Sequence, residues 1–376
     1  MKLLLCDELG IEFPLFAFSH CRDVVAAVSR AGGMGVLGAV TLTPEELDVE
    51  LRWIQEHTDG KPYGLDLIVP ETVHGKGKAV DEERLLASIP DQHTGFVETV
   101  LSEHGIDPAA TRDTRASQIR FAHNLQADGA DELLEVAMRY PIRLIANALG
   151  VPPQRLLDRG KQHGIPVAAL VGSREQALKQ ADAGVDIIIA AGGEAGGHCS
   201  EISTMVLVPE VVEAIAGRVP VLAAGGIVTG RQMAACMAMG AAGAWTGSVW
   251  LTTAESEATP VIRDKLVRAR SRDTVRSRSR TGKPSRQLRS AWTDAWETGS
   301  LEPLPMPLQT LLTEPALGHI DKLSQSGHAG AQELATYWVG QGVGLMNHET
   351  TVRAVMQDFQ EDFLSAYDRL HRMMES

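Results

Sequence analysis

The sequence predicts an α/β protein, a (β/α)8 TIM barrel, from three observations. Eight short apolar runs recur along the chain, and most are continuous rather than alternating, as expected of parallel strands covered on both faces. Stretches with helical end signals lie between these runs, and Gly-rich turns follow several of them. The alternative is a doubly wound open sheet, because a strand count from one sequence can err by one or two.

The apolar runs predict the number and positions of the strands. The expected strands are residues 13–19, 33–40, 63–69, 142–149, 166–171, 185–191, 220–226 and 243–251. Among the expected helices, residues 43–57 begin with a Thr-Pro pair, and 173–184 begin with serine and end on glycine. Residues 229–241 form a third capped stretch, so the strands are joined by crossover helices.

Two segments do not follow the repeat. Residues 70–140 are rich in charges and histidine, and we expect a mostly helical insertion after the third strand that forms a lid or small subdomain. Residues 252–346 follow the eighth strand and are expected to be a C-terminal extension with a hairpin that covers the site. The barrel is then expected from residues 1–69, 141–251 and 347–376, the last of these an amphipathic helix on the body.

The charge balance limits the partners of the protein. The chain of 376 residues has a formal net charge of −13, which argues against nucleic acid and anionic membranes as partners. No run reaches 18 apolar residues, and the four cysteines form no CxxC pair. We therefore expect a soluble cytoplasmic protein that acts on a small molecule, with a homodimer as one open possibility for its assembly.

Two Gly-rich turns suggest a phosphate site. "AGGI" and "TGS" follow the seventh and eighth expected strands, whose carboxyl ends share the ligand-binding face of a barrel. Their backbone N–H groups, near helix N-termini, can form a phosphate cup, where a Cβ would block the approach of an oxygen. The alternative is that these glycines only allow tight turns.

The stretch "GGEAGGHCS" (192–200) carries the candidate base. His198 lies at the end of a glycine arm after the sixth strand, and an imidazole can accept a proton at neutral pH. Cys199 is a weak candidate nucleophile, because no base is placed for it. Glu194 can be an acid, a metal ligand or a helix-cap partner, and the lack of a second carboxylate at fixed spacing argues against a metal site.

A basic segment stands out against the acidic whole. Eleven Lys or Arg residues fall between Arg263 and Arg289. They could bind an anionic substrate such as an acyl-CoA or a nucleotide. The interpretation we favour is a solvated helix face followed by a charged hairpin.

Four stretches together resemble the nitronate monooxygenase (2-nitropropane dioxygenase-like) family: "VDIIIAAGGEAGGH", "VPVLAAGGIVTGRQMAACMAMGAAGAWTGSVWLTTAES", "SRTGKPSRQLRSAW" and "WVGQGVGLM". The early "FPLFAFSHCRDVVAAVSRAGGMGVLGA" is similar to the first strand and helix of that family. The likeness covers most of the chain outside residues 70–140.

The resemblance implies a barrel that holds FMN non-covalently at the carboxyl ends of its strands. The residues that correspond to the family's phosphate cup are Ala224, Gly225, Gly226, Gly247 and Ser248. The implied reaction is the oxidation of an alkyl nitronate by flavin and O2 to a carbonyl compound and nitrite.

The arm has its own implied part in that site. Gly196 and Gly197 would let backbone pass beside the flavin ring. His198 corresponds to the family histidine that takes the α-proton of a nitroalkane or orients the nitronate. A protonated His198 would also stabilise the anionic nitronate.

The sequence departs from the family pattern at two strands. The first strand ends Ala17-Phe18-Ser19, where the family has Ala-Pro-Met. The third strand carries Asp66 toward the flavin, where the family has Asn. A carboxylate there would disfavour the anionic reduced flavin unless it is protonated or paired.

Two other functions remain open from the sequence. An FMN-dependent NAD(P)H reductase acting on a quinone, enone or acyl-CoA would keep the barrel and the flavin, and the basic segment and altered first strand fit it. A phosphate-binding barrel without flavin needs only the glycine cup and gives no role to His198.

Overall fold

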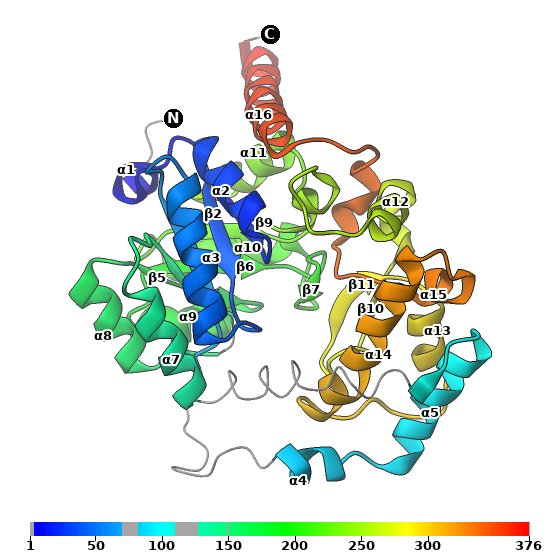
Figure 1. Ribbon diagram of the computed structural model, residues 1–376. Helices are drawn as coiled ribbons and strands as arrows, with labels where there is room; N and C mark the ends of the chain where they lie inside the picture. The colour runs from blue at the N-terminus through cyan, green and yellow to red at the C-terminus, as the bar shows by residue number, and fades with distance from the viewer. Residues whose placement is uncertain (1–3, 70–81, 110–126, 149, 376) are drawn as a thin grey trace.

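The protein is a closed barrel of eight parallel strands in the computed structural model, which describes residues 4–69, 82–109, 127–148 and 150–375 (Figure 1). Strand β9 pairs back to β1, so the sheet has no edge. This confirms the (β/α)8 barrel and excludes the open sheet. The strands are β1 (Leu15–Ser19), β2 (Met34–Gly38), β3 (Tyr63–Leu67), β4 (Ile145–Asn147), β5 (Val167–Val171), β6 (Ile187–Ala191), β8 (Val221–Ala224) and β9 (Gly243–Thr246).

Helices cover the outside of the barrel (Figure 1). The crossover helices are α2 (Arg22–Arg30), α3 (Pro44–His57), α7 (Ala127–Ala137), α8 (Gln154–His163), α9 (Arg174–Ala183), α10 (Thr204–Ile215) and α11 (Gly230–Ala238). The C-terminal helix α16 (Val352–Glu375) takes the eighth place, where it packs on α11 and α2. Their ends follow the sequence signals, as shown by the capping box of Thr43 and the left-handed Gly184 that ends α9.

The last strand is shorter than the sequence predicts. The apolar run 243–251 was expected to be one strand, but β9 ends at Thr246 and residues Ser248–Thr252 form a short 3-10 helix, η2. The indole N–H of Trp250 lies 3.1 Å from the hydroxyl oxygen of Thr246, so the buried Trp250 folds back onto the strand end. Apolar content alone does not separate a buried strand from a buried short helix.

Side chains fill the lower part of the barrel. An interior cluster joins residues that point inward from the strands, such as Phe16, Leu144 and Trp245, with Leu5 and Leu9 from helix α1 (Leu4–Leu9). Trp245 stacks on Phe16 with ring centroids 6.1 Å apart. The interior is therefore packed, and a ligand can enter only above these layers, at the carboxyl ends of the strands.

Part of the predicted insertion 70–140 can be described. Helices α4 (Glu82–Ala87) and α5 (Asp91–Glu103) are separated at Pro90, as the sequence indicated, and α5 packs on α14 (Leu308–Gln325). Residues 70–81 and 110–126 lie outside the described residues. The division into barrel, insertion and extension therefore stays a prediction.

The segment after β9 forms a second body of short elements beside the barrel (Figure 1). A three-stranded antiparallel sheet joins β10 (Thr274–Ser277) and β11 (Ser285–Leu288) to β7 (Gly197–His198), which belongs to the arm after β6. The remaining elements are α12 (Pro260–Arg268), η3 (Ser271–Asp273), α13 (Ala291–Thr298), α15 (Ala329–Leu334) and η4 (Gln341–Leu345).

Helix α16 is packed against the barrel only over its first half. Val352, Val355, Met356 and Phe359 are buried against the barrel, whereas Tyr367 is 60% exposed, because the end of the helix projects beyond the body (Figure 1). By its helical spacing Tyr367 lies on the same face of α16 as Phe359, so the spacing alone does not show where the packing ends. In the described part of the chain, every helix is too short or too polar to cross a membrane.

Candidate active site

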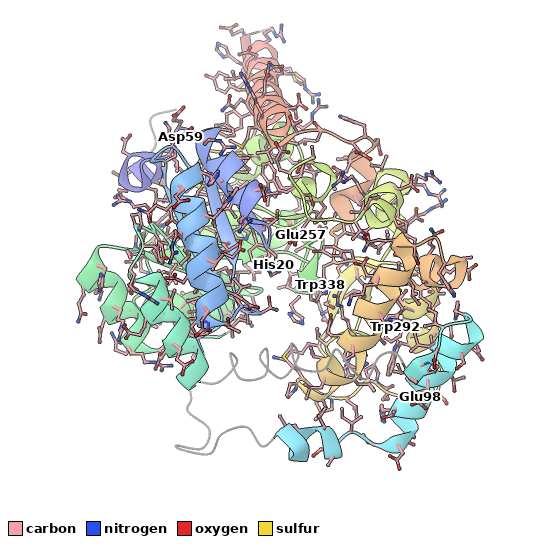
Figure 2. The ribbon with its side chains drawn as sticks, viewed as in Figure 1. His20, Asp59, Glu98, Glu257, Trp292 and Trp338 are labelled. Carbon is pink, nitrogen blue, oxygen red and sulfur yellow. The ribbon has the colours of Figure 1, made fainter. Side chains whose placement is uncertain are left out.

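The mouth of the barrel is formed by the loops after β6, β8 and β9 and by the elements that follow β9. Figure 2 shows His20, at the end of β1, near the centre of the molecule, with Trp338 on the side of the later elements. The His20 ring nitrogen Nδ1 lies 2.9 Å from the carbonyl oxygen of Gly38. A Cβ on Gly38 would come within 2.8 Å of that ring, so a glycine here makes room for the His20 side chain.

Glu194 fixes the glycine arm at its base. Its Oε2 accepts hydrogen bonds from the backbone N–H and the hydroxyl of Thr204, the first residue of α10, both at 2.8 Å. The carbonyl of Glu194 accepts from the backbone N–H of Gln341 at 2.9 Å. Of the three roles open to Glu194 from the sequence, the geometry shows the helix-cap partner. The described residues contain no group of three His, Cys, Asp or Glu side chains that could hold a metal ion.

The two Gly-rich turns after β8 and β9 present free backbone donors. Among the described residues, no hydrogen bond from the N–H groups of Gly226, Gly247 or Ser248 is found. All three residues are partly buried, and three N–H groups without a protein partner at the ends of neighbouring strands suit an oxyanion. Ala224 ends β8, and its carbonyl accepts from Gly192 at 2.9 Å.

The shape of this turn depends on glycine. Gly225 and Gly226 have φ angles of +110° and +69°. A Cβ on Gly225 would lie 2.6 Å from the Thr204 hydroxyl oxygen, and one on Gly226 would lie 3.0 Å from Cβ of Glu194. The free donors and the arm are thus held in one arrangement by Glu194 and Thr204.

The two glycines expected to pass beside a flavin differ in their surroundings. A Cβ on Gly196 would come within 2.8 Å of the backbone nitrogen of Gly340, so Gly196 is needed for close packing of the chain. Gly197 has a φ of +72° and open space where a Cβ would lie. Of the two, Gly197 alone has room for a neighbouring group at its Cβ position.

Asp66 points into the barrel near the end of β3. The residue is 5% exposed, and burial raises the pKa of its carboxyl well above the usual range. In the described part of the chain the carboxyl forms no hydrogen bond or ion pair. Burial therefore favours the protonated, neutral form of the Asp66 carboxyl, whose O–H can donate a hydrogen bond.

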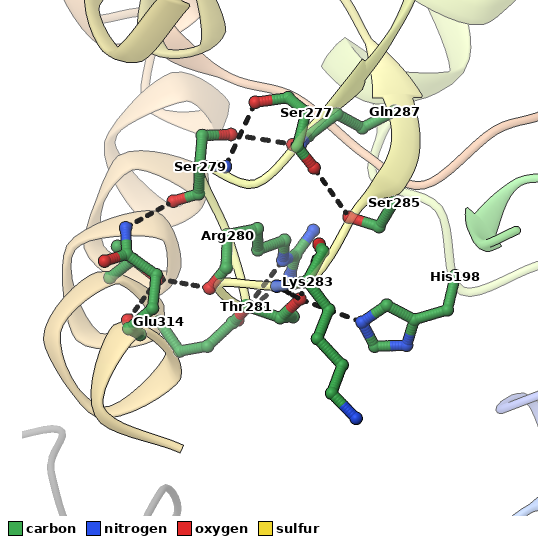
Figure 3. Close-up of polar contacts among 11 residues, drawn as sticks. His198, Ser277, Ser279, Arg280, Thr281, Lys283, Ser285, Gln287 and Glu314 are labelled. Carbon is green, nitrogen blue, oxygen red and sulfur yellow. Dashed lines mark hydrogen bonds and ion pairs between the residues drawn. The ribbon is translucent and has the colours of Figure 1, made fainter. Parts of the chain in front are cut away.

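His198 stands at the tip of the arm, opposite these strand ends. Its backbone pairs with Ser285 of β11, and its Nε2 lies 2.8 Å from the hydroxyl oxygen of Thr281 (Figure 3). Partial burial and the nearby Lys283 ammonium lower the pKa of His198 to about 4. The residue is exposed to solvent, although the elements around its ring displace much of the water there. Its lowered pKa favours the neutral imidazole, so His198 fits a proton acceptor better than the protonated donor also considered from the sequence.

Thr281 and Lys283 are site residues that sequence reasoning missed. Both were part of the quoted "SRTGKPSRQLRSAW", but nothing in local spacing shows that this turn reaches an arm some 80 residues earlier. Cys199, next to the histidine, is a partly buried free thiol. The pairing of β7 with β11 is the contact that brings the two segments together.

The basic segment 263–289 is largely used within the fold. Arg276 pairs with Glu201, Arg278 with Glu302, and Arg280 with Glu314. Other pairs in the segment are Arg263–Glu349, Arg268–Asp264, Arg270–Asp273 and Arg289–Asp294. Most of these charges are therefore paired with carboxylates of the same chain. Lys283 forms no ion pair among the described residues and stays beside His198.

Known proteins resemble the chain over its whole length. The family model described as nitronate monooxygenase matches residues 4–362. The Mycobacterium tuberculosis protein "Putative monooxygenase Rv1533" is 49% identical over 100% of both chains. A "Probable nitronate monooxygenase" of Bacillus subtilis is 27% identical over 96% of this chain and 98% of its own.

Solved structures show the same fold. FabK from Thermotoga maritima superposes with a TM-score of 0.74 and 26% identity over 99% of both chains. A nitroalkane oxidase from Streptomyces ansochromogenes gives a TM-score of 0.77 at 24% identity, over 97% of this chain and 99% of its own.

Proposed function

Because the chain belongs to the nitronate monooxygenase family, a family of flavin-dependent oxidoreductases, we propose that it binds FMN at the barrel mouth and oxidises alkyl nitronates with O2. The products are a carbonyl compound and nitrite. The observation that carries this proposal is the placing of free N–H groups after β8 and β9 opposite a neutral imidazole at the tip of the arm. The first suits a phosphate, and the second suits a substrate with an acidic C–H bond.

The residues at the mouth fit FMN. The N–H groups of Gly226, Gly247 and Ser248 would hold the phosphate, and the Ser248 hydroxyl, which accepts from Gly340 N–H at 2.8 Å, has its own hydrogen free for the same group. Gly225 and Ala224 shape that turn. Gly197, with open space at its Cβ position, would let the flavin ring lie against the arm.

Asp66 fits the cofactor only because it is neutral. A buried carboxylate would repel the negative charge that a reduced flavin carries, whereas a protonated carboxyl adds a hydrogen-bond donor and no charge. Burial without a cationic partner keeps the proton on Asp66. The departure from Asn in the family pattern thus still leaves a neutral donor in place.

The chain itself supplies position and proton transfer. When bound, the flavin supplies the electron acceptor for the oxidation of the nitronate. His198 accepts the α-proton of a nitroalkane or holds the nitronate oxygens, since it is exposed to solvent and its ring is neutral at neutral pH. The positive charge of Lys283 nearby favours an anionic substrate at this point.

The test begins with the visible spectrum of the purified protein. Flavin absorption and release of FMN on heating are expected, and a colourless protein that releases no FMN would contradict every flavin-based function. The anaerobic enzyme is then mixed with propyl nitronate or with NADH. We expect nitronate to bleach the flavin; rapid bleaching by NADH alone would favour the NAD(P)H-dependent reductase instead.

His198→Asn tests the proposed base. We expect the turnover of nitroalkane to fall by roughly a hundredfold or more, with the flavin retained. Cys199→Ser is the matched control, because it changes the neighbouring side chain and should leave turnover within about threefold. Turnover by His198→Asn within that same range would remove His198 from the reaction. The expected homodimer stays a prediction that sedimentation can test.

A further inference from the structure

The hairpin of β10 and β11 contacts His198 at two points. Residues Gly197 and His198 form the strand β7, which pairs antiparallel with β11, so the backbone of His198 is fixed. Thr281, in the turn between β10 and β11, then holds the side chain through the 2.8 Å contact of its hydroxyl with Nε2. Figure 3 shows the imidazole, Thr281 and Lys283 side by side.

We propose that Thr281 is a positioning residue, which keeps the proton of the neutral imidazole on Nε2 and leaves Nδ1 as the atom that accepts the substrate proton. This inference rests on the proposed role of His198 as the base. It assigns a function to the Thr281 hydroxyl, which the proposed reaction does not otherwise use.

The hydrogen bonds available to the Thr281 hydroxyl determine which tautomer of His198 fits. The Thr281 hydroxyl lies 3.2 Å from the carbonyl oxygen of Lys283 and 3.3 Å from its backbone nitrogen, in addition to Nε2 of His198. A hydroxyl has one proton and two acceptor positions. If it donates to the Lys283 carbonyl, it can accept from both the Lys283 N–H and an Nε2–H, and all three contacts are satisfied. If it donates to Nε2, the carbonyl contact is lost.

The other ring nitrogen is free to act. Nδ1 of His198 has no hydrogen-bond partner among the described residues, and the residue is exposed to solvent. With the proton on Nε2, the lone pair lies on Nδ1. The Lys283 ammonium beside the ring disfavours a second proton, so the free form persists at neutral pH.

The turn that carries Thr281 is braced from the far side. The Thr313 hydroxyl of α14 lies 2.7 Å from the Arg280 carbonyl oxygen, and Gln309 of the same helix donates to the Ser279 carbonyl at 2.9 Å. The Arg280 side chain pairs with Glu314 through two contacts of 2.5 and 3.0 Å (Figure 3). These contacts are largely buried, so the hydroxyl of Thr281 has little freedom to leave the ring.

The tautomer can be read directly by NMR. Two-bond 1H–15N spectra of protein with 15N-labelled histidine distinguish the two neutral tautomers, and the signal of His198 is the one lost in His198→Asn. We expect the Nε2–H form in the wild type at neutral pH. Thr281→Val should give a mixture or the Nδ1–H form, whereas Thr281→Ser, which keeps the hydroxyl, should restore the Nε2–H form.

A second variant separates the effect of the Thr281 hydroxyl on His198 from a general loosening of the β10–β11 turn. Thr313→Val removes one brace of the same turn and leaves the Thr281 hydroxyl, so it should keep the Nε2–H form. In turnover, Thr281→Val should lower kcat at least about tenfold and change KM less than about threefold, while Thr281→Ser and Thr313→Val stay close to the wild type.

Two results would overturn the inference: an Nδ1–H tautomer in the wild type, or an unchanged tautomer in Thr281→Val. The NMR measurement needs no turnover. A protein that shows the Nε2–H form and its dependence on Thr281, but does not oxidise nitronate, would therefore contradict the proposed function alone.

Discussion

The neutral state of Asp66 predicts how stability changes with pH. A carboxyl whose pKa is higher in the folded than in the unfolded chain retains a proton that the unfolded chain has lost. Folding stability is therefore lost as pH rises from the usual Asp value, near 4, toward the folded value. Asp66→Asn puts a neutral side chain of similar size in the same place. The free energy of unfolding of this variant therefore lacks the pH-dependent contribution of Asp66.

The size of the effect follows from proton linkage. One proton held only by the folded state changes the free energy of unfolding by about 1.4 kcal/mol per pH unit. If Asp66 stays protonated from pH 5 to pH 8, the wild type loses about 4 kcal/mol relative to Asp66→Asn over those roughly three units. A folded pKa inside that range would appear as the pH at which the difference stops changing.

Urea unfolding of both proteins, stripped of small ligands and measured at intervals between pH 5 and pH 8, gives this difference. Other titrating groups cancel because they are common to both chains. Asp59→Asn is the control for the chemical change itself, since it makes the same substitution in an exposed turn away from the barrel interior. A constant difference between wild type and Asp66→Asn over the whole range would mean that the carboxyl is ionised in the folded protein, and the account of its neutrality would be wrong.

Three further changes test the site. Gly225→Ala places a Cβ 2.6 Å from the Thr204 hydroxyl at a φ of +110°, and should destabilise the protein by about 1–3 kcal/mol and weaken FMN binding, as urea unfolding and flavin titration would show. Glu314→Gln leaves the largely buried Arg280 without its anion and should lower the free energy of unfolding by about 3 kcal/mol. Glu302→Gln breaks the exposed pair with Arg278 and should lower it by less than about 1 kcal/mol. Thr204→Val removes the hydroxyl between Glu194 and Gly225 and should raise the dissociation constant of FMN without abolishing the fold, which equilibrium dialysis can measure.

The sequence predicts the barrel well because its signals are local. Continuous apolar runs, the Thr43 cap and the glycine that ends α9 each depend on residues close in the chain. The predicted end of β9 was wrong because a buried strand and a buried 3-10 turn share the same apolar composition. The outward half of α16 was also missed, since periodicity does not show how far a helix extends beyond its partner.

The site could be predicted only in part, for a similar reason. His198, Gly225 and Gly226 follow strand ends, and strand ends of a barrel share one face, so their place follows from local pattern. The contacts of Thr281 with His198 and of Glu194 with Thr204 join segments that only the tertiary fold brings together. Their residue types, a threonine in a turn and a glutamate among glycines, are common in roles unrelated to a site.

The dependence of His198 on the β10–β11 turn has a consequence for synthesis of the chain. All eight barrel strands have been made once Thr246 is added, but the turn with Thr281, its brace in α14 and the Gly340 segment follow later. Since chains fold from the N-terminus as they are made, the barrel can close before its histidine is fixed. On the proposed role of His198, the chain therefore becomes active late in its synthesis, when the final third has emerged and most of the hydrophobic core already exists.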